Sequence, residues 1–226
     1  MERHQRATRL GRPPKQEARN TRERILDAAL ERFAAQGYAA TSLRQIAQAV
    51  GINESAIYAH FESKEAVFST LCEQMVTPAV LIQEALGSDL AAVARREPEA
   101  VVRQLMQQII EMWNTPRARL FFSVMMREGK LGSDPLSALL LPGIEQTEAQ
   151  LSILIHQWME QGRLRNDFPA EHLVWELLAP LANIRALYWH AQATQEQREL
   201  GYRRADLHIE YFLSTTLLRN TDETHA

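Results

Sequence analysis

The sequence of 226 residues has a single cysteine, Cys72, which excludes a disulfide within the chain and a zinc site built on cysteine ligands. It has no apolar run near the roughly 20 residues that span a bilayer, and no apolar segment follows its charged N-terminus as in a secretory signal. These absences exclude most secreted and membrane proteins. We therefore expect a cytoplasmic protein without membrane contact.

The motifs of common enzyme classes are also missing. The sequence contains no HExxH or GxSxG motif, no glycine-rich phosphate loop and no metal-ligand spacing. Its seven histidines are scattered without partners at fixed offsets. We therefore expect neither enzymatic activity nor a metal ion or other cofactor.

Strand patterns are absent as well, because no stretch alternates apolar and polar residues over several positions. Apolar residues make up 46% of the chain and recur at helical spacing, which predicts an all-α fold of nine or ten helices. We expect Pro78, Pro142 and Pro180 to kink or interrupt the helices in which they lie. The predicted helices are 20–36, 43–50, 54–60, 64–86, 89–96, 98–113, 116–129, 143–162, 170–191 and 202–218, with loops at 130–135 and 192–201.

The net charge of −3 is unevenly distributed along the chain. Residues 1–24 carry eight cations and three anions, a charge of +5, whereas the remainder carries −8. Residues 1–19 have few large apolar side chains, and we expect a flexible basic arm that ends where Asn20 caps the first helix. Arg12 lies in a Gly-Arg-Pro-Pro-Lys segment typical of arms that enter the minor groove of DNA, but a solvated tail explains the segment equally well.

Two short helices joined by a glycine are predicted within residues 41–64. Ser42 and Gln45 have the spacing of a capping box, and the apolar residues that follow give the first helix a buried face. Gly51 then supplies the positive φ that a tight turn requires, and Asn53 can cap the next helix. This arrangement is typical of the helix-turn-helix, whose second helix enters the major groove of DNA.

Residues 22–68 resemble the DNA-binding domain of the TetR family of bacterial transcriptional regulators. The matching segments are RILDAA from Arg24, FAAQGY from Phe33, TSLRQIA from Thr41, VGI from Val50, IYAHF from Ile57 and SKE from Ser63. The resemblance implies a homodimer in which an N-terminal three-helix domain binds DNA and a larger C-terminal helical domain binds a small-molecule effector. On this basis we expect a basic arm at 1–19, a DNA-binding domain at 20–66 and an effector-binding and dimerisation domain at 67–226.

The resemblance also implies which residues contact double-stranded DNA. Arg44 is the best candidate for a guanine contact because its fork of donors matches guanine O6 and N7, whereas Tyr58 and Lys64 would bind phosphates. Glu54 would be repelled by phosphates unless it accepts a hydrogen bond from cytosine N4. The full set of implied contacts is Ser42, Arg44, Asn53, Glu54, Ser55, Ala56, Tyr58, His60 and Lys64, with Arg12 added from the arm.

Large, adaptable side chains are concentrated in the later part of the chain, where all four tryptophans and five of the seven methionines follow residue 100. Such residues either fill an ordinary core or line an apolar pocket between helices, and the sequence leaves both open. Because no acidic or basic cluster accompanies them, we expect a small and largely apolar effector. The candidate pocket residues are Met106, Trp113, Phe121, Phe122, Met125, His156, Asn183 and Tyr188.

Apolar stripes on the predicted helices 143–162 and 170–191 suggest how a homodimer forms. A four-helix interface between two copies would bury both stripes, although packing within one chain would bury them too. The residues expected at this interface are Leu151, Ile155, Trp158, Leu177, Leu181 and Ile184.

Together these features predict a ligand-responsive repressor that binds a palindromic operator as a dimer and is released by its effector. We expect the effector to tilt the helix 64–86, which leaves the DNA-binding domain, and so to change the separation of the two recognition helices. A regulator that works without an effector, or one that activates transcription, is the alternative interpretation.

Overall fold

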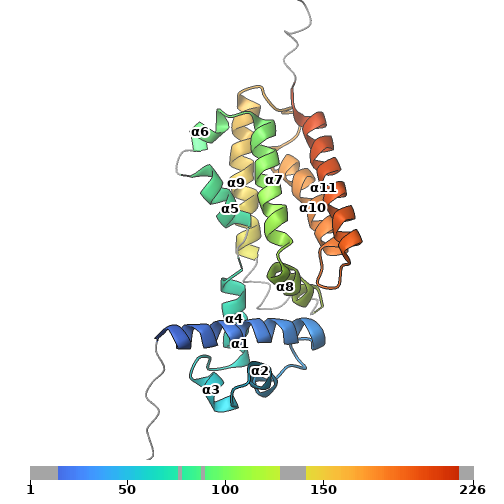
Figure 1. The fold of residues 1–226 in the computed structure, drawn as a ribbon. Coiled ribbons are helices and arrows are strands. Elements are labelled where there is room, and N and C mark those ends of the chain that lie inside the picture. Colours follow the sequence, from blue (N-terminus) through green and yellow to red (C-terminus); the bar gives the residue numbers. More distant parts are fainter. Residues whose placement is uncertain (1–14, 76–77, 88–89, 128–140, 219–226) are drawn as a thin grey trace, which may run out of the picture.

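The computed structural model describes residues 15–75, 78–87, 90–127 and 141–218 (Figure 1). Within these residues the regular structure is helical, apart from one isolated bridge between Leu164 and Leu217, so the predicted all-α fold is confirmed. No helix in these ranges has the length and apolarity needed to cross a lipid bilayer. The described helices are α1 (Lys15–Gln36), α2 (Leu43–Val50), α3 (Glu54–Tyr58), α4 (Lys64–Glu73), α5 (Pro78–Leu86), α6 (Leu90–Ala94), α7 (Pro98–Trp113), α8 (Pro116–Arg127), α9 (Leu141–Glu160), α10 (Ala170–Tyr188) and α11 (Gln195–Thr216).

The helices form two groups that meet at α8 (Figure 1). Helices α1 to α4 lie at one end of the molecule, and α2 and α3 are the helices farthest from the second group. The second group contains α5, α6, α7, α9, α10 and α11, and its long helices run side by side. Each group has its own apolar core, and the core of the first group includes side chains of α8.

The smaller core holds α1 to α4 together. Ile25 and Phe33 of α1, Ile46 of α2 and Ile57 of α3 are each 0% exposed. Phe33 also contacts Phe68 of α4, with ring centroids 5.8 Å apart. Burial of each such side chain contributes about 1.5–3 kcal/mol. Because Phe68 belongs to this core, the core continues past residue 66, the predicted end of the DNA-binding domain.

Helix α1 begins at Lys15, before the predicted start at Asn20. That prediction was wrong because residues 15–19 are all reasonable helix formers, while Pro13 and Pro14 before them can only precede a helix or occupy its first turn. Asn20 therefore lies inside the helix and does not cap it. Residues 1–14, which include Arg12 and most of the predicted arm, lie outside the described residues.

The predicted helix 64–86 is two helices, α4 and α5, so eleven helices are described rather than nine or ten. Pro78 is the first residue of α5, where the missing proline N–H costs no helical hydrogen bond. Pro142 likewise lies in the first turn of α9. Pro180, by contrast, lies inside α10, which continues to Tyr188.

Helix α11 begins at Gln195, so part of the predicted loop 192–201 is helical. The Thr194 hydroxyl accepts a hydrogen bond from the Gln197 N–H at 3.2 Å. The Gln197 side chain accepts one from the Thr194 N–H at 2.8 Å. The Thr-x-x-Gln spacing of this capping box is the sequence signal for the earlier start.

Helix α11 packs tightly against the end of α10 at Gly201. A Cβ atom at this position would lie 2.5 Å from Nε1 of Trp189 and 2.7 Å from Cβ of Tyr188. The Trp189 ring has little room to move, because it is fully buried and its Nε1 donates to the Arg198 carbonyl at 3.2 Å. The absence of a side chain at Gly201 therefore allows the two helices to pack.

We expect Gly201→Ala to lower the free energy of unfolding by about 1–2 kcal/mol, measured by urea denaturation. Alanine gains about 1 kcal/mol in helix propensity, but the overlap with two buried neighbours outweighs that gain. Arg203→Ala, an exposed position of the same helix, is the control and should change stability by less than about 0.5 kcal/mol. Equal stability of the two variants would contradict the close approach.

Candidate DNA-binding surface and effector region

Helix α2 has the capped start that the sequence predicts. The Ser42 hydroxyl accepts a hydrogen bond from the Gln45 N–H at 3.3 Å, and the Gln45 side chain accepts one from the Ser42 N–H at 2.9 Å. At the other end Gly51 has a φ of 77°, and its N–H donates to the Gln48 carbonyl at 3.2 Å. The predicted capping box, the helix bounds 43–50 and the left-handed glycine are all confirmed.

Helix α3 is positioned by one cap and one buried side chain. The Asn53 side chain accepts a hydrogen bond from the Ala56 N–H at 2.8 Å, which confirms the predicted N-cap. Ile57 is 0% exposed and attaches the helix to the smaller core. The helix ends at Tyr58 rather than at residue 60, so His60 follows it, with its N–H donating to the Ile57 carbonyl at 2.8 Å.

The described residues among those predicted to contact DNA are accessible, and five of them belong to α2 and α3, at the end of the molecule away from the second helix group (Figure 1). Arg44 is exposed and forms no hydrogen bond or ion pair with any described residue. Tyr58 is 55% exposed. The exposed members of the set are Ser42, Arg44, Asn53, Glu54, Ser55 and Tyr58, and the half-buried ones are Ala56, His60 and Lys64.

Lys64 has a structural role that the sequence does not reveal. Its Nζ donates to the carbonyls of Tyr38 at 2.7 Å and Thr41 at 2.8 Å, and it lies 4.2 Å from the centroid of the Tyr38 ring. The Tyr38 hydroxyl in turn donates to Glu65 at 3.0 Å. Hydrogen bonds from the Glu65 N–H, Ser63 and Tyr38 hold the pKa of Glu65 below its usual value. Lys64 therefore joins the start of α4 to the segment that leads into α2.

Helix α8 belongs to the core of the first helix group. Phe121, Val124 and Met125 are at most 4% exposed and pack among side chains of α1 and α4. The Phe121 ring stacks on Phe68 of α4 with centroids 6.3 Å apart. The assignment of Phe121 and Met125 to an effector pocket is therefore wrong, because both face the DNA-binding helices instead.

Polar contacts strengthen this junction. Arg117 of α8 forms an ion pair with Asp27 of α1 at 2.5 Å and donates to Gln74 at 2.7 Å. Arg127, the last residue of α8, donates to the Ala35 carbonyl at 2.7 Å and the Ala34 carbonyl at 3.1 Å. A cation at these carbonyls complements the negative end of the α1 dipole.

The other predicted effector residues do not line one pocket. Met106 is 0% exposed in the larger core, whereas His156 and Asn183 lie exposed on its surface. Tyr188 is half-buried, with the Arg204 guanidinium 5.5 Å from its ring centroid. The remaining two, Trp113 and Phe122, both contact the guanidinium of Arg185, a residue that no sequence motif marks.

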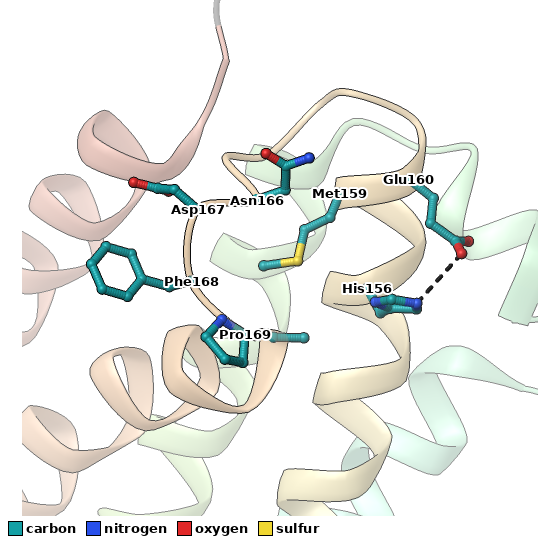
Figure 2. A pocket seen from close by; sticks show the side chains of 8 residues that line it. His156, Met159, Glu160, Asn166, Asp167, Phe168 and Pro169 are labelled. Carbon is teal, nitrogen blue, oxygen red and sulfur yellow. Dashed lines mark ion pairs between the residues drawn. The ribbon is translucent and has the colours of Figure 1, made fainter.

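A surface recess of about 460 Å³ lies between the end of α9 and the start of α10 (Figure 2). His156 lines it and lies 3.4 Å from Glu160. Asn166, Asp167 and Phe168 from the connecting loop complete the wall. The recess is open to solvent, and its lining mixes charged and polar side chains with apolar ones such as Met159 and Phe168. Of the residues expected to line an effector pocket, only His156 is among its lining residues. The described residues contain no group of three or more His, Cys, Asp or Glu side chains that could hold a metal ion.

The residues predicted at a dimer interface are buried within their own chain. Leu151, Ile155, Trp158, Leu177, Leu181 and Ile184 are all at most 8% exposed and belong to the larger core. The prediction was wrong because an apolar stripe shows that a helix face is buried without showing by which partner. Other faces of α10 and α11 expose large apolar side chains, namely Trp175, Leu187, Tyr202, Leu207 and Tyr211.

The segment of the chain that matches a known protein family includes the two helices of the helix-turn-helix, α2 and α3. The sequence model of the family described as "Bacterial regulatory proteins, tetR family" matches residues 25–71. The chain is 29% identical to the HTH-type transcriptional regulator AcrR of Shigella flexneri over 179 residues, which are 77% of each protein. It is 33% identical to TtgW of Pseudomonas putida, an uncharacterized HTH-type transcriptional regulator, over 113 residues, or 50% of this chain and 78% of TtgW.

A solved structure shares the fold over most of the chain. SmeT, the repressor of the Stenotrophomonas maltophilia multidrug efflux pump SmeDEF, aligns with a TM-score of 0.66 at 20% identity, covering 90% of this chain and 94% of SmeT. The SmeT–triclosan complex aligns with a TM-score of 0.70 at 20% identity, covering 89% and 93% of the two chains. At this identity the match establishes a common fold alone.

We expect Lys64→Met to lower the free energy of unfolding by about 1.5–3 kcal/mol, because two carbonyls lose a charged donor. Urea denaturation monitored by circular dichroism measures the change. Arg44→Met, which removes an exposed cation without any contact among the described residues, is the matched control and should stay within about 0.5 kcal/mol of the wild type. If both variants behave alike, Lys64 does not hold α2 in place.

Proposed function

The chain belongs to the TetR family of bacterial regulatory proteins, and from this premise we propose that it is a repressor that binds a near-palindromic operator as a homodimer and releases it when a small, largely apolar effector binds the second helix group. The observation that carries the proposal is the exposed polar surface of α2 and α3, held in place by two caps and a buried core. The recognition helix of a helix-turn-helix needs such a surface to enter the major groove.

The proposed contacts follow from the chemistry of this surface. Arg44 would donate two hydrogen bonds, to guanine O6 and N7. Its guanidinium is available for them, since it forms no hydrogen bond or ion pair with any described residue. Tyr58 and the remaining donor of Lys64 would bind phosphates, which position the protein without reading sequence. Glu54 would accept from cytosine N4. The other proposed contacts are Ser42, Asn53, Ser55, Ala56, His60 and, from the arm, Arg12.

The proposed homodimer forms through α10 and α11. Trp175 is 60% exposed on α10, and Leu207 and Tyr211 are 71% and 66% exposed on α11. Large exposed apolar side chains concentrated on two adjacent helices are typical of subunit interfaces. A two-fold arrangement of these helices would cover them and would fix the spacing of two recognition helices at about one turn of DNA or more.

Coupling between effector and DNA would pass through α8. One side of this helix lies in the smaller core through Phe121, and Ser123 accepts a hydrogen bond from the Ala191 N–H of the second group at 2.8 Å. Because α4 and α5 are separate helices, a single rigid rod over 64–86 is not available to carry the movement. An effector that shifts α8 would therefore change the pose of α1 and α4, with a reciprocal coupling of about 1–3 kcal/mol.

The DNA-binding proposal is tested by gel shift with the DNA upstream of the protein's own gene. We expect Arg44→Ala to weaken operator binding roughly tenfold or more and to relax discrimination at one base pair, because a bidentate contact is worth about 1–3 kcal/mol. Arg32→Ala removes the same charge from an exposed position of α1 and serves as the control. Unchanged affinity and sequence preference in Arg44→Ala would contradict the assignment.

The dimer proposal is tested by sedimentation equilibrium. We expect Tyr211→Asp to raise the dissociation constant of the dimer about a hundredfold or more, because it places a charge in an apolar interface. Ile153→Asp alters a comparably exposed apolar residue of α9, 52% exposed, and should leave the dimer intact. A dimer that tolerates Tyr211→Asp would have to form through other helices.

A further inference from the structure

Arg185 of α10 lies at a point where three helices meet. Its guanidinium carbon is 4.2 Å from the ring centroid of Phe122 in α8 and 4.8 Å from that of Trp113 in α7. The side chain as a whole is half-buried, but its Nε atom is fully shielded from solvent. A positive charge therefore lies at the junction of α7, α8 and α10.

This charge has no anionic partner in the part of the chain that the structure describes. The Arg185 side chain forms no hydrogen bond or ion pair there, and its Nε donor is unsatisfied. The indole N–H of Trp113 beside it is also buried without an acceptor. Burial lowers the pKa of Arg185 to about 9, so the guanidinium still carries its charge at neutral pH.

The two aromatic rings offset only part of the free-energy cost of burying the guanidinium. Their π faces attract the cation, but they offer no lone pairs to the N–H donors at the edge of the guanidinium. A methionine at this position would fill a similar volume without bringing a buried charge, and such replacements are often neutral or stabilising. The presence of an arginine at this position is therefore best explained by a ligand that binds at the junction and accepts hydrogen bonds from the guanidinium.

We propose that Arg185 binds the carboxylate of an effector whose remaining body is apolar and lies beside Phe122 and Trp113. This inference rests on the function proposed above and defines the chemical class of its effector. A carboxylate accepts two parallel hydrogen bonds from a guanidinium fork, and the Trp113 N–H supplies a third donor nearby. The aromatic rings suit an apolar body, and Trp113 belongs to the larger apolar core.

The charge balance favours a carboxylate over a phosphate. Phosphate monoesters carry nearly two negative charges, which would call for a second guanidinium at the same point. Arg119 of α8 also has a buried and unsatisfied Nε, but the neighbouring charge that lowers its pKa, after burial, is that of Arg198.

The position of Arg185 connects this site to the DNA-binding end. Its partner Phe122 precedes Ser123 and follows Phe121 on α8, and Phe121 lies in the smaller core. A carboxylate that draws the guanidinium toward itself alters the contact with Phe122. The movement then reaches α1 and α4 through the buried side of α8.

The first test uses the unmodified protein and three probes: benzoate, its neutral analogue benzamide, and inorganic phosphate. We expect benzoate, at up to millimolar concentration, to raise the melting temperature and change tryptophan fluorescence, since Trp113 borders the site. Benzamide and phosphate should bind at least roughly tenfold more weakly, because they lack the charge or the apolar body. No binding of benzoate, or equal binding of benzamide or phosphate, overturns the proposal.

The second test compares variants of two arginines that both contact an aromatic ring. Arg185→Met should weaken benzoate binding roughly tenfold or more while leaving benzamide unaffected. Arg204→Met, which removes the exposed guanidinium near Tyr188, should bind benzoate like the wild type. If Arg185→Met does not fold, Arg185→Lys supplies the comparison, because it keeps the charge but loses the fork and should bind more weakly than the wild type. Unchanged benzoate affinity in a folded Arg185 variant overturns the proposal.

Failure of this inference is distinguishable from failure of the proposed function. Both tests above measure ligand binding without DNA. Benzoate binding in a protein that shifts no upstream DNA would support the carboxylate site and contradict the repressor. Operator binding in a protein that ignores benzoate would support the repressor and contradict the carboxylate site.

Discussion

Phe121 of α8 stacks on Phe68 of α4, and this apolar contact joins the two ends of the molecule. The helices that present α2 and α3 would otherwise expose part of their core to solvent, because α8 covers it with three buried side chains. The ion pair of Arg117 with Asp27 and the hydrogen bonds from Arg127 to α1 add directional constraints to the same junction. Apolar, ionic and hydrogen-bonded contacts together therefore fix α1 and α4 against α8.

Local structure was predictable from the sequence where the signal lies within a few residues. The capping box of Ser42 and Gln45, the left-handed Gly51 and the cap at Asn53 depend on neighbours in the chain, and the structure confirms all three. The same kind of signal at Thr194 and Gln197 marks the start of α11. The all-α class followed from helical spacing of apolar residues, which is a property of each segment alone.

The identity of the partner that buries each helix face could not be predicted in this way. Apolar spacing shows that Phe121 and Leu181 face a core, but the core of Phe121 belongs to the DNA-binding helices and that of Leu181 to its own helix group. The surroundings of the charged side chains of Lys64 and Arg185 could not be predicted from the sequence either. The carbonyls that bind Lys64 are 23 and 26 positions away, and the isolation of Arg185 depends on three helices meeting.

The cap that Arg127 places on the end of α1 spans more than 90 positions of the chain. The DNA-binding unit is therefore not a contiguous stretch of sequence that can be exchanged by one cut. A chimera that receives residues 15–75 alone would leave Phe68 against a foreign helix and the α1 carbonyls without their arginine. The unit that packs as one is α1 to α4 together with α8, so an exchange of this unit between relatives would have to include the buried surface of α8.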